Sequence, residues 1–186
     1  GLMASLALGA DGVWIGTKFI ATHEAHTGKG YKEKILESRE DDVVVSKGYT
    51  GKTCRVIRTE WSNHWEKNPS ELQGFPGQAI AAAQAAMQLK CPHRVILGTD
   101  GPAGSGVQPL GILRMIALLS SLGNIPPELV FCFATGNTAR MRDLNCGLIE
   151  PGRAADLVFM DRAQHTAGRD LLDSVKLGDI PGIGMV

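Results

Sequence analysis

The sequence lacks most of the features that assign a protein to a function class at sight. Its 19 lysines and arginines balance 19 aspartates and glutamates and are scattered, which excludes a basic nucleic-acid footprint or a polybasic membrane patch. No apolar run approaches the roughly 20 residues that a membrane span needs. The four cysteines, Cys54, Cys91, Cys132 and Cys146, form no C-x-x-C pair, which argues against a zinc knot. We therefore expect a cytoplasmic protein with reduced thiols.

Histidines are also few, and their spacing is unfavourable for a metal site. The five are His23, His26, His64, His93 and His165, and no two of them are separated by a single residue. The stretch H-E-A-H could place His23 and His26 on one helix face as a metal pair, but the H-E-x-x-H spacing and a third ligand are missing. The alternative is that both are surface residues. His93 and His165 are likewise expected on the surface.

What is present predicts an α/β protein of one domain or two small ones, with 44% hydrophobic residues to form a core. Helices are expected over residues 2–8, 29–38, 79–90, 106–123, 125–144 with a break at 136–137, and 167–178. Strands are expected at 13–15, 43–45, 56–57, 94–97 and 156–161. Residues 59–78, rich in Pro, Gly, Asn and Ser, are the best linker candidate. The runs at 13–15 and 94–97 are apolar on both faces, which predicts a parallel sheet covered by helices.

Asp100 follows the apolar run of the stretch "RVILGTDGPAGSG" and opens a loop that contains Gly104 and Gly106. An aspartate at the carboxyl end of a barrel strand is where catalytic and metal-binding groups are found. Asp100 could ligate a divalent metal and take the proton of an attacking water. The alternative is that it caps the turn through its own backbone.

Gly16 and Thr17 follow the apolar run of "DGVWIGTKF". Their backbone N–H groups, with that of Lys18, could point at an oxyanion, and a glycine allows close approach of a ligand. The alternative is an ordinary turn at the end of a strand.

Residues 1 to about 78 carry the stretches "ASLALGADGVWIGTKFIATHEA", "YKEKILES", "CRVIRTEW" and "FPGQ" in this order. They resemble the C-terminal part of the FMN-dependent nitronate monooxygenases, the barrel enzymes also called 2-nitropropane dioxygenases. The resemblance implies that Gly16 and Thr17 contact the FMN phosphate. It also implies that a Gly-Gly phosphate loop and the catalytic histidine belong upstream of Gly1.

Residues 88–186 carry the strand-end Asp100, the helix ending "ATGNTAR", and a G-x-I-x-P-G-x-x-A-D-L turn that begins at Gly147. They resemble the C-terminal part of metal-dependent amidohydrolases, most closely the enamidase type, which hydrolyse the C–N bond of a cyclic amide or enamide. The resemblance implies that Asp100 is the last ligand of a divalent metal (Zn or Fe) and the general base. It also implies that "EPGRAADLVFMD" returns to a small β-sandwich. The family's H-x-H, its bridging lysine or acidic residue and its other strand-end histidines have no counterpart here.

Both resemblances together predict C-terminal pieces of two (β/α)8 barrels, 1–78 and 88–186, joined over 79–87, with neither barrel complete. The opening "GLMASL" and the closing "DIPGIGMV" lie within secondary-structure patterns, so we expect both ends to be cut. We also expect loose packing between the two segments, because neither evolved against the other. The first hypothesis is an inactive hybrid fragment whose parent families act on small molecules. The alternatives are part of a working amidohydrolase, part of a working FMN oxidoreductase, or a non-catalytic module that docks on a full-length relative.

Overall fold

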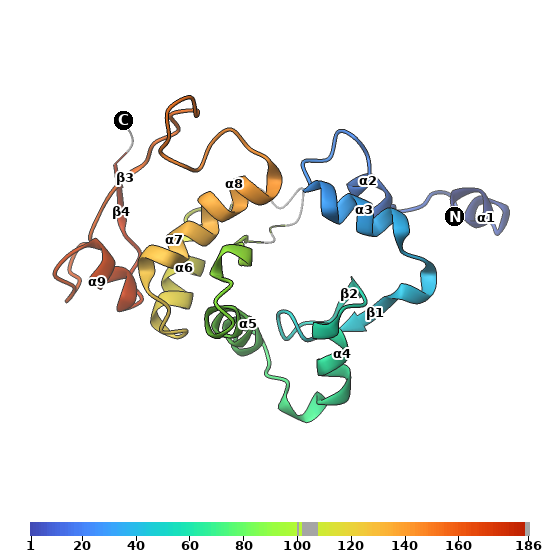
Figure 1. Ribbon diagram of the computed structural model, residues 1–186, viewed down its shortest axis with the longest axis horizontal. Helices are drawn as coiled ribbons and strands as arrows, with labels where there is room; N and C mark the ends of the chain where they lie inside the picture. The colour runs from blue at the N-terminus through green and yellow to red at the C-terminus, as the bar shows by residue number, and fades with distance from the viewer. Residues whose placement is uncertain (100, 102–107, 185–186) are drawn as a thin grey trace.

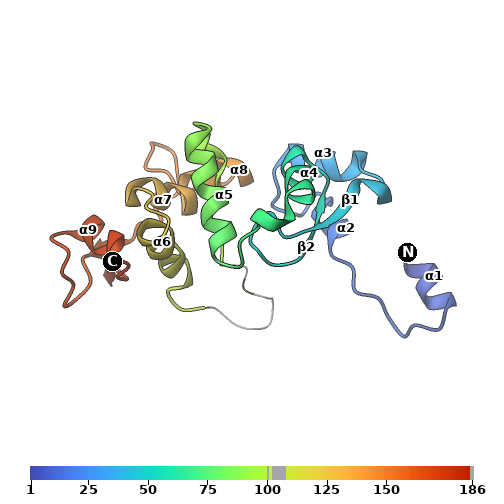
Figure 2. The same cartoon turned by 90° about the horizontal axis from the view of Figure 1, so that it is seen from below.

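The computed structural model describes residues 1–99, 101 and 108–184 as a series of short helices with two small sheets (Figures 1 and 2). The α-helices are α1 (Leu2–Ala7), α2 (Thr17–Ile20), α3 (Lys29–Glu37), α4 (Glu60–Lys67), α5 (Gly77–Gln88), α6 (Gly111–Ser121), α7 (Pro127–Ala134), α8 (Gly136–Arg142) and α9 (Leu171–Lys176). In this part of the chain no helix combines the length and the apolar character needed to cross a membrane. The mixed α/β class is as the sequence predicts.

The two sheets are antiparallel pairs of two strands each. Strand β1 (Val43–Ser46) pairs with β2 (Cys54–Ile57), with Val44 opposite Val56. Strand β3 (Phe159–Asp161) pairs with β4 (Gly182–Gly184). The predicted strands at 43–45 and 56–57 are confirmed, whereas the one predicted at 156–161 is reduced to its last three residues.

The two strands expected to form a parallel sheet are absent, and that prediction was wrong. Residues 13–15 and 95–99 are irregular backbone, and 92–94 form a single 3₁₀ turn. A parallel strand is stable only when neighbours satisfy its N–H and C=O groups on its edges, and neither segment has a strand beside it among the described residues. The second segment is held instead by α7, because the N–H of Leu97 donates to the carbonyl of Phe133 at 3.1 Å.

The expected linker at 59–78 is also wrong, since it contains α4 and a 3₁₀ turn at Pro69–Glu71. Helix α4 begins with a reciprocal cap. The Thr59 hydroxyl accepts from the N–H of Ser62 at 3.2 Å, and the Ser62 hydroxyl accepts from the N–H of Thr59 at 2.9 Å. Such a cap satisfies two free N–H groups at the start of a helix, so a segment with a loop-like composition forms one.

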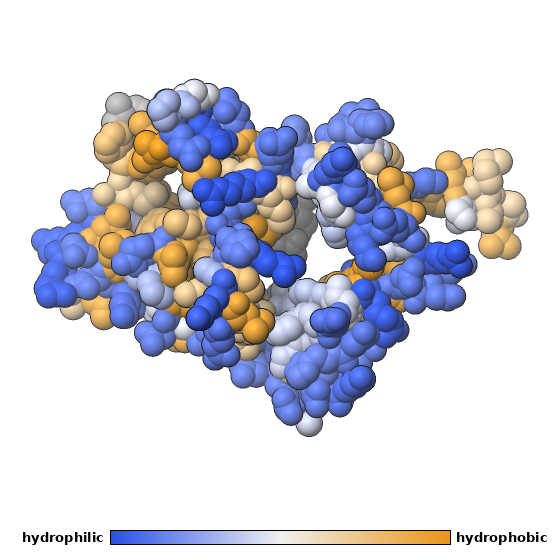
Figure 3. Space-filling view, viewed as in Figure 1, coloured by the Kyte–Doolittle hydropathy of each residue, from blue (hydrophilic) through white to orange (hydrophobic). Residues whose placement is uncertain are grey.

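The hydrophobic core lies entirely in the second part of the chain, where α5, α6, α7 and α9 pack together. Its buried members are Ala83, Leu113, Ile116, Leu119, Ile125, Val130, Phe133 and Val175. By contrast, none of residues 1–43 is buried. Both ribbon views show α1 apart from the rest, and the space-filling view shows its apolar residues in orange at that end (Figure 3). The loose packing expected between the halves agrees with a core confined to one of them.

A buried amide at the start of α5 holds the β1–β2 hairpin and the chain that precedes this helix. Gln78 is fully buried; its Nε2 donates to the carbonyl of Gly48 at 3.0 Å and its Oε1 accepts from the N–H of Gln73 at 3.1 Å. The Gly48 carbonyl also accepts from Trp61 Nε1 at 2.9 Å. Because a buried polar group without a partner is costly, these bonds fix the β1–β2 hairpin and α4 against the first turn of α5.

We expect the core position Phe133 to determine stability and the exposed aromatic position Trp14 to contribute little. Phe133→Ala empties a fully buried site and should reduce the free energy of unfolding by about 3–5 kcal/mol. The matched control Trp14→Ala should change it by less than about 0.5 kcal/mol, because the Trp14 side chain is 101% exposed. Urea denaturation followed by circular dichroism measures both. A Trp14→Ala loss as large as that of Phe133→Ala would show that residues 13–15 are packed in solution.

Loss of the Gln78 amide should loosen the hairpin without unfolding the core. Gln78→Met keeps the size of the side chain but leaves the N–H of Gln73 without its partner, which should cost about 1–3 kcal/mol locally. Hydrogen exchange should therefore speed up at 43–57 and 60–78 and stay unchanged in α6 and α7. The control Gln84→Met removes a bond from an exposed side chain to the Gly123 carbonyl and should not affect the hairpin. Unchanged exchange at 43–57 in Gln78→Met would contradict this role.

Candidate functional site

The turn that carries Gly16 and Thr17 is a surface feature. Gly16 precedes α2 with a φ of −112° and accepts from the N–H of Phe19 at 3.0 Å. This φ is open to any residue, and a Cβ at Gly16 would meet nothing within 4 Å. The close approach for which a glycine was expected is therefore not made within the described chain.

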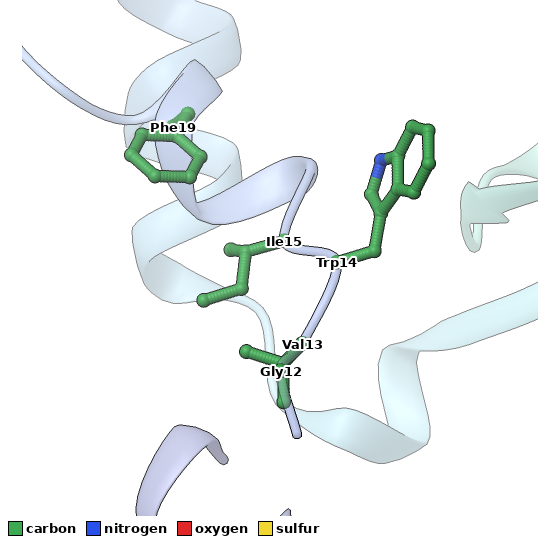
Figure 4. Close-up of a pocket in the computed structure, with 5 residues that line it drawn as sticks. All are labelled: Gly12, Val13, Trp14, Ile15 and Phe19. Carbon is green, nitrogen blue, oxygen red and sulfur yellow. The ribbon is translucent and has the colours of Figure 1, made fainter. Parts of the chain in front are cut away.

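Close to this turn is a shallow hollow lined by residues 12–15 and Phe19 (Figure 4). Val13 and Ile15 point to one side of the backbone and Trp14 to the other, as the alternation of an extended chain requires (Figure 4). The Trp14 side chain is 101% exposed and the Phe19 side chain 64% exposed. The apolar run predicted to be buried is thus exposed on the side of Trp14 and only half-buried at Val13 and Ile15.

Thr17 faces a different cavity, of about 580 Å³, which Lys34 and Arg55 also line together with Glu40. Gly16 lines neither this cavity nor the hollow. Since the two residues do not share a cavity, the described residues do not enclose a flavin phosphate as the resemblance implies. The FMN contact of Gly16 and Thr17 remains a prediction from the resemblance.

Asp100, Gly104 and Gly106 lie outside the described residues, so the position of the candidate metal ligand is not part of this structure. The segment that leads to Asp100 is held by a residue that sequence reasoning did not single out. Asn137, 8% exposed at the start of α8, donates from Nδ2 to the carbonyls of Pro92 at 2.9 Å and Val95 at 2.8 Å. The signal available in the sequence was the amide side chain directly after Gly136 in "ATGNTAR". When such a polar side chain is buried, it must find hydrogen-bond partners.

Metal-ligating side chains do not converge elsewhere in the described ranges. Among residues 1–99, 101 and 108–184, no three His, Cys, Asp or Glu side chains form a group able to hold a metal ion. His23 and His26 lie in a turn before α3 and not on a helix, and both are exposed. His93 and His165 are exposed as expected. These residues do not fit a catalytic zinc site, which takes about three protein ligands.

Glu24, between the first two histidines, is a local turn residue. Its pKa is lowered chiefly by a hydrogen bond with its own backbone N–H, then by the Thr22 hydroxyl and by the charge of Lys32. The Lys32 ammonium also donates to the Thr22 carbonyl at 2.6 Å. These contacts stabilise the turn, and they account for Glu24 without a metal.

Two groups of known proteins resemble the chain. An enamidase of Eubacterium barkeri is 42% identical over 113 residues, which is 61% of this chain and 29% of the enamidase. A protein of Staphylococcus saprophyticus named "Probable nitronate monooxygenase" is 38% identical over 78 residues, 42% of this chain and 22% of that protein. The chain thus spans less than a third of the length of these relatives. Both resemblances read from the sequence are confirmed.

The fold has a solved counterpart. The crystal structure of an enamidase, described as a new member of the amidohydrolase superfamily, matches with a TM-score of 0.60 and 31% sequence identity. The match covers 86% of this chain and 44% of that one. It therefore extends beyond the 61% of the chain aligned with the bacterial enamidase by sequence.

The family model described as nitronate monooxygenase matches residues 1–103. This match continues past residue 78, where the first segment was expected to end, and includes the segment before Asp100. As it covers more than half of the 186 residues, the chain belongs to the nitronate monooxygenase family and is at the same time similar to enamidase.

Proposed function

We propose that these 186 residues join the closing part of a nitronate monooxygenase barrel, 1–78, to the closing part of an enamidase-type amidohydrolase, 88–186, through a junction at 79–87. By itself this polypeptide catalyses neither flavin-dependent oxidation of a nitronate nor hydrolysis of a cyclic amide or enamide C–N bond. It is a hybrid fragment that keeps the folds of its relatives in part and the activity of neither.

The observation that carries the proposal is the exposure of apolar side chains in both segments. Trp14 is 101% exposed in the first segment, and Ile149 is 94% exposed in the second. Leu157, Val158 and Phe159, in the run expected to enter a β-sandwich, are 52%, 56% and 58% exposed. Soluble domains rarely leave such runs uncovered, so both segments have the character of elements made to pack against further chain.

The candidate site residues support the same conclusion. Active sites of barrel enzymes are assembled from loops at the ends of several strands, and each segment supplies one such end. Asp100 would be a metal ligand and general base, and Gly16 and Thr17 would bind the FMN phosphate. Among the described residues no three His, Cys, Asp or Glu side chains form a group able to hold a metal ion, and Gly16 and Thr17 lie at a turn without a shared cavity.

A second function is favoured by the extent of the enamidase likeness. The structural match to enamidase covers 86% of the chain, more than either sequence match. In a longer parent chain, residues 88–186 would then close an amidohydrolase barrel, and Asp100 would join metal ligands supplied by other strands.

Purification of the 186-residue polypeptide, followed by measurement of bound flavin and metal, tests the proposal. We expect flavin fluorescence of the denatured protein and elemental analysis for zinc and iron each to give far less than one equivalent. Hydrolysis of a cyclic enamide and oxidation of a nitronate should both stay at the uncatalysed rate.

The variants Asp100→Asn and Thr17→Val serve as the matched controls. If the proposal holds, neither changes the metal or flavin content of the purified protein. One equivalent of metal that is lost in Asp100→Asn would establish the amidohydrolase function in its place. One equivalent of flavin that is lost in Thr17→Val would establish the oxidoreductase.

A further inference from the structure

A cavity of about 980 Å³ lies where the two segments meet. One wall comes from α2, α3 and the turn between them, including Ile20, Tyr31 and Lys34. The other comes from the segment before Asp100 and from the end of α8, with Ile96, Met141 and Arg142. Neither segment forms this cavity alone, so it is a feature of the joined chain.

The two segments approach closely at one edge of this junction cavity. A Cβ at Gly28 would lie 2.6 Å from the carbonyl oxygen of Met141, so only glycine permits this approach. Beside it, Arg142 Nη1 donates to the carbonyl of His26 at 3.4 Å. The cavity wall is therefore held by backbone contact, and any side chain at residue 28 would separate its two sides.

The charges around the junction cavity have one sign. Lys29, Lys34 and Arg142 line it, and no aspartate or glutamate does. Lys29 is 3.7 Å from the Glu33 carboxylate, whereas Lys34 and Arg142 form no ion pair with a carboxylate in the described part of the chain. Cations without partners make a positive potential that attracts anions.

Most of the remaining lining side chains are apolar, with Thr27 and His26 as polar exceptions. Ile20, Ile96 and Met141 supply hydrophobic surface and Tyr31 an aromatic ring. A cavity of this volume with mostly apolar walls and a few convergent polar groups has the character of a small-molecule site. The cationic side chains favour a ligand with a negative charge, and the apolar side chains favour a ligand whose remaining surface is apolar.

We propose that the junction cavity binds a small organic anion, an apolar ring that bears one carboxylate or sulfonate group. The ring packs on Ile20, Ile96 and Met141, and the anionic group lies between Lys34 and Arg142. This binding requires neither flavin nor metal and is independent of whether the polypeptide catalyses a reaction.

Isothermal titration of the 186-residue polypeptide with naphthalene-2-sulfonate tests the proposal, with neutral naphthalene-2-sulfonamide as the matched ligand. We expect saturable binding of one sulfonate, weakened by salt, and much weaker binding of the sulfonamide. Lys34→Gln and Arg142→Gln should each raise the Kd about tenfold, as the loss of one charge-assisted contact predicts. The control Lys176→Gln, in α9, should leave the Kd unchanged.

Gly28→Ala separates the walls without changing a charge, and it should also weaken binding. Circular dichroism shows whether the core remains folded, which we expect because it lies outside residues 1–79. The proposal is overturned by absence of saturable binding at millimolar sulfonate, by equal affinity for the sulfonamide, or by a Kd that neither Lys34→Gln nor Arg142→Gln changes.

Discussion

A parallel strand depends on neighbouring strands, because the N–H and C=O groups on its edges must be paired when it is buried. Residues 13–15 and 95–97 have the composition of such strands and have no strand beside them in the described structure. They therefore remain irregular, and the turn at Gly16 and Thr17 remains on the surface. Because strand ends position the catalytic groups of a barrel, the absence of this sheet from the described residues supports the proposal that the polypeptide is inactive.

Elements that satisfy their own hydrogen bonds behave differently. Helices α5, α6, α7 and α9 pair their backbone groups internally and bury apolar faces against each other around Val130 and Phe133. The β1–β2 hairpin pairs its strands through a short turn, with Gly51 at a φ of +84°. Gln78, at the start of α5, is the buried connection between this helix and the hairpin.

The sequence was sufficient to predict the helices and strands that depend on local interactions. The helix-forming residues of 79–90 and the apolar residues of 106–123 predicted α5 and α6, Gly136 predicted the break between α7 and α8, and β-branched runs predicted β1 and β2. It could not predict whether 13–15 and 94–97 would become strands, since that depends on neighbours distant in sequence. The composition of 59–78 concealed α4, because the Thr59–Ser62 cap depends on two residues among many polar ones. The motif residues Gly16 and Thr17 were located, yet only the structure shows that Thr17 lines a cavity and Gly16 does not.

Hydrogen exchange of the backbone amides tests most directly the proposal that a strand segment without neighbours stays unpaired and leaves the site at its end incomplete. The amides of residues 13–15 should exchange at nearly the rate of an unfolded chain, while those of Ile116 and Val130 should be protected by the stability of the core. Protection of residues 13–15 equal to that of the core would show that they are paired in a sheet, and it would contradict the account.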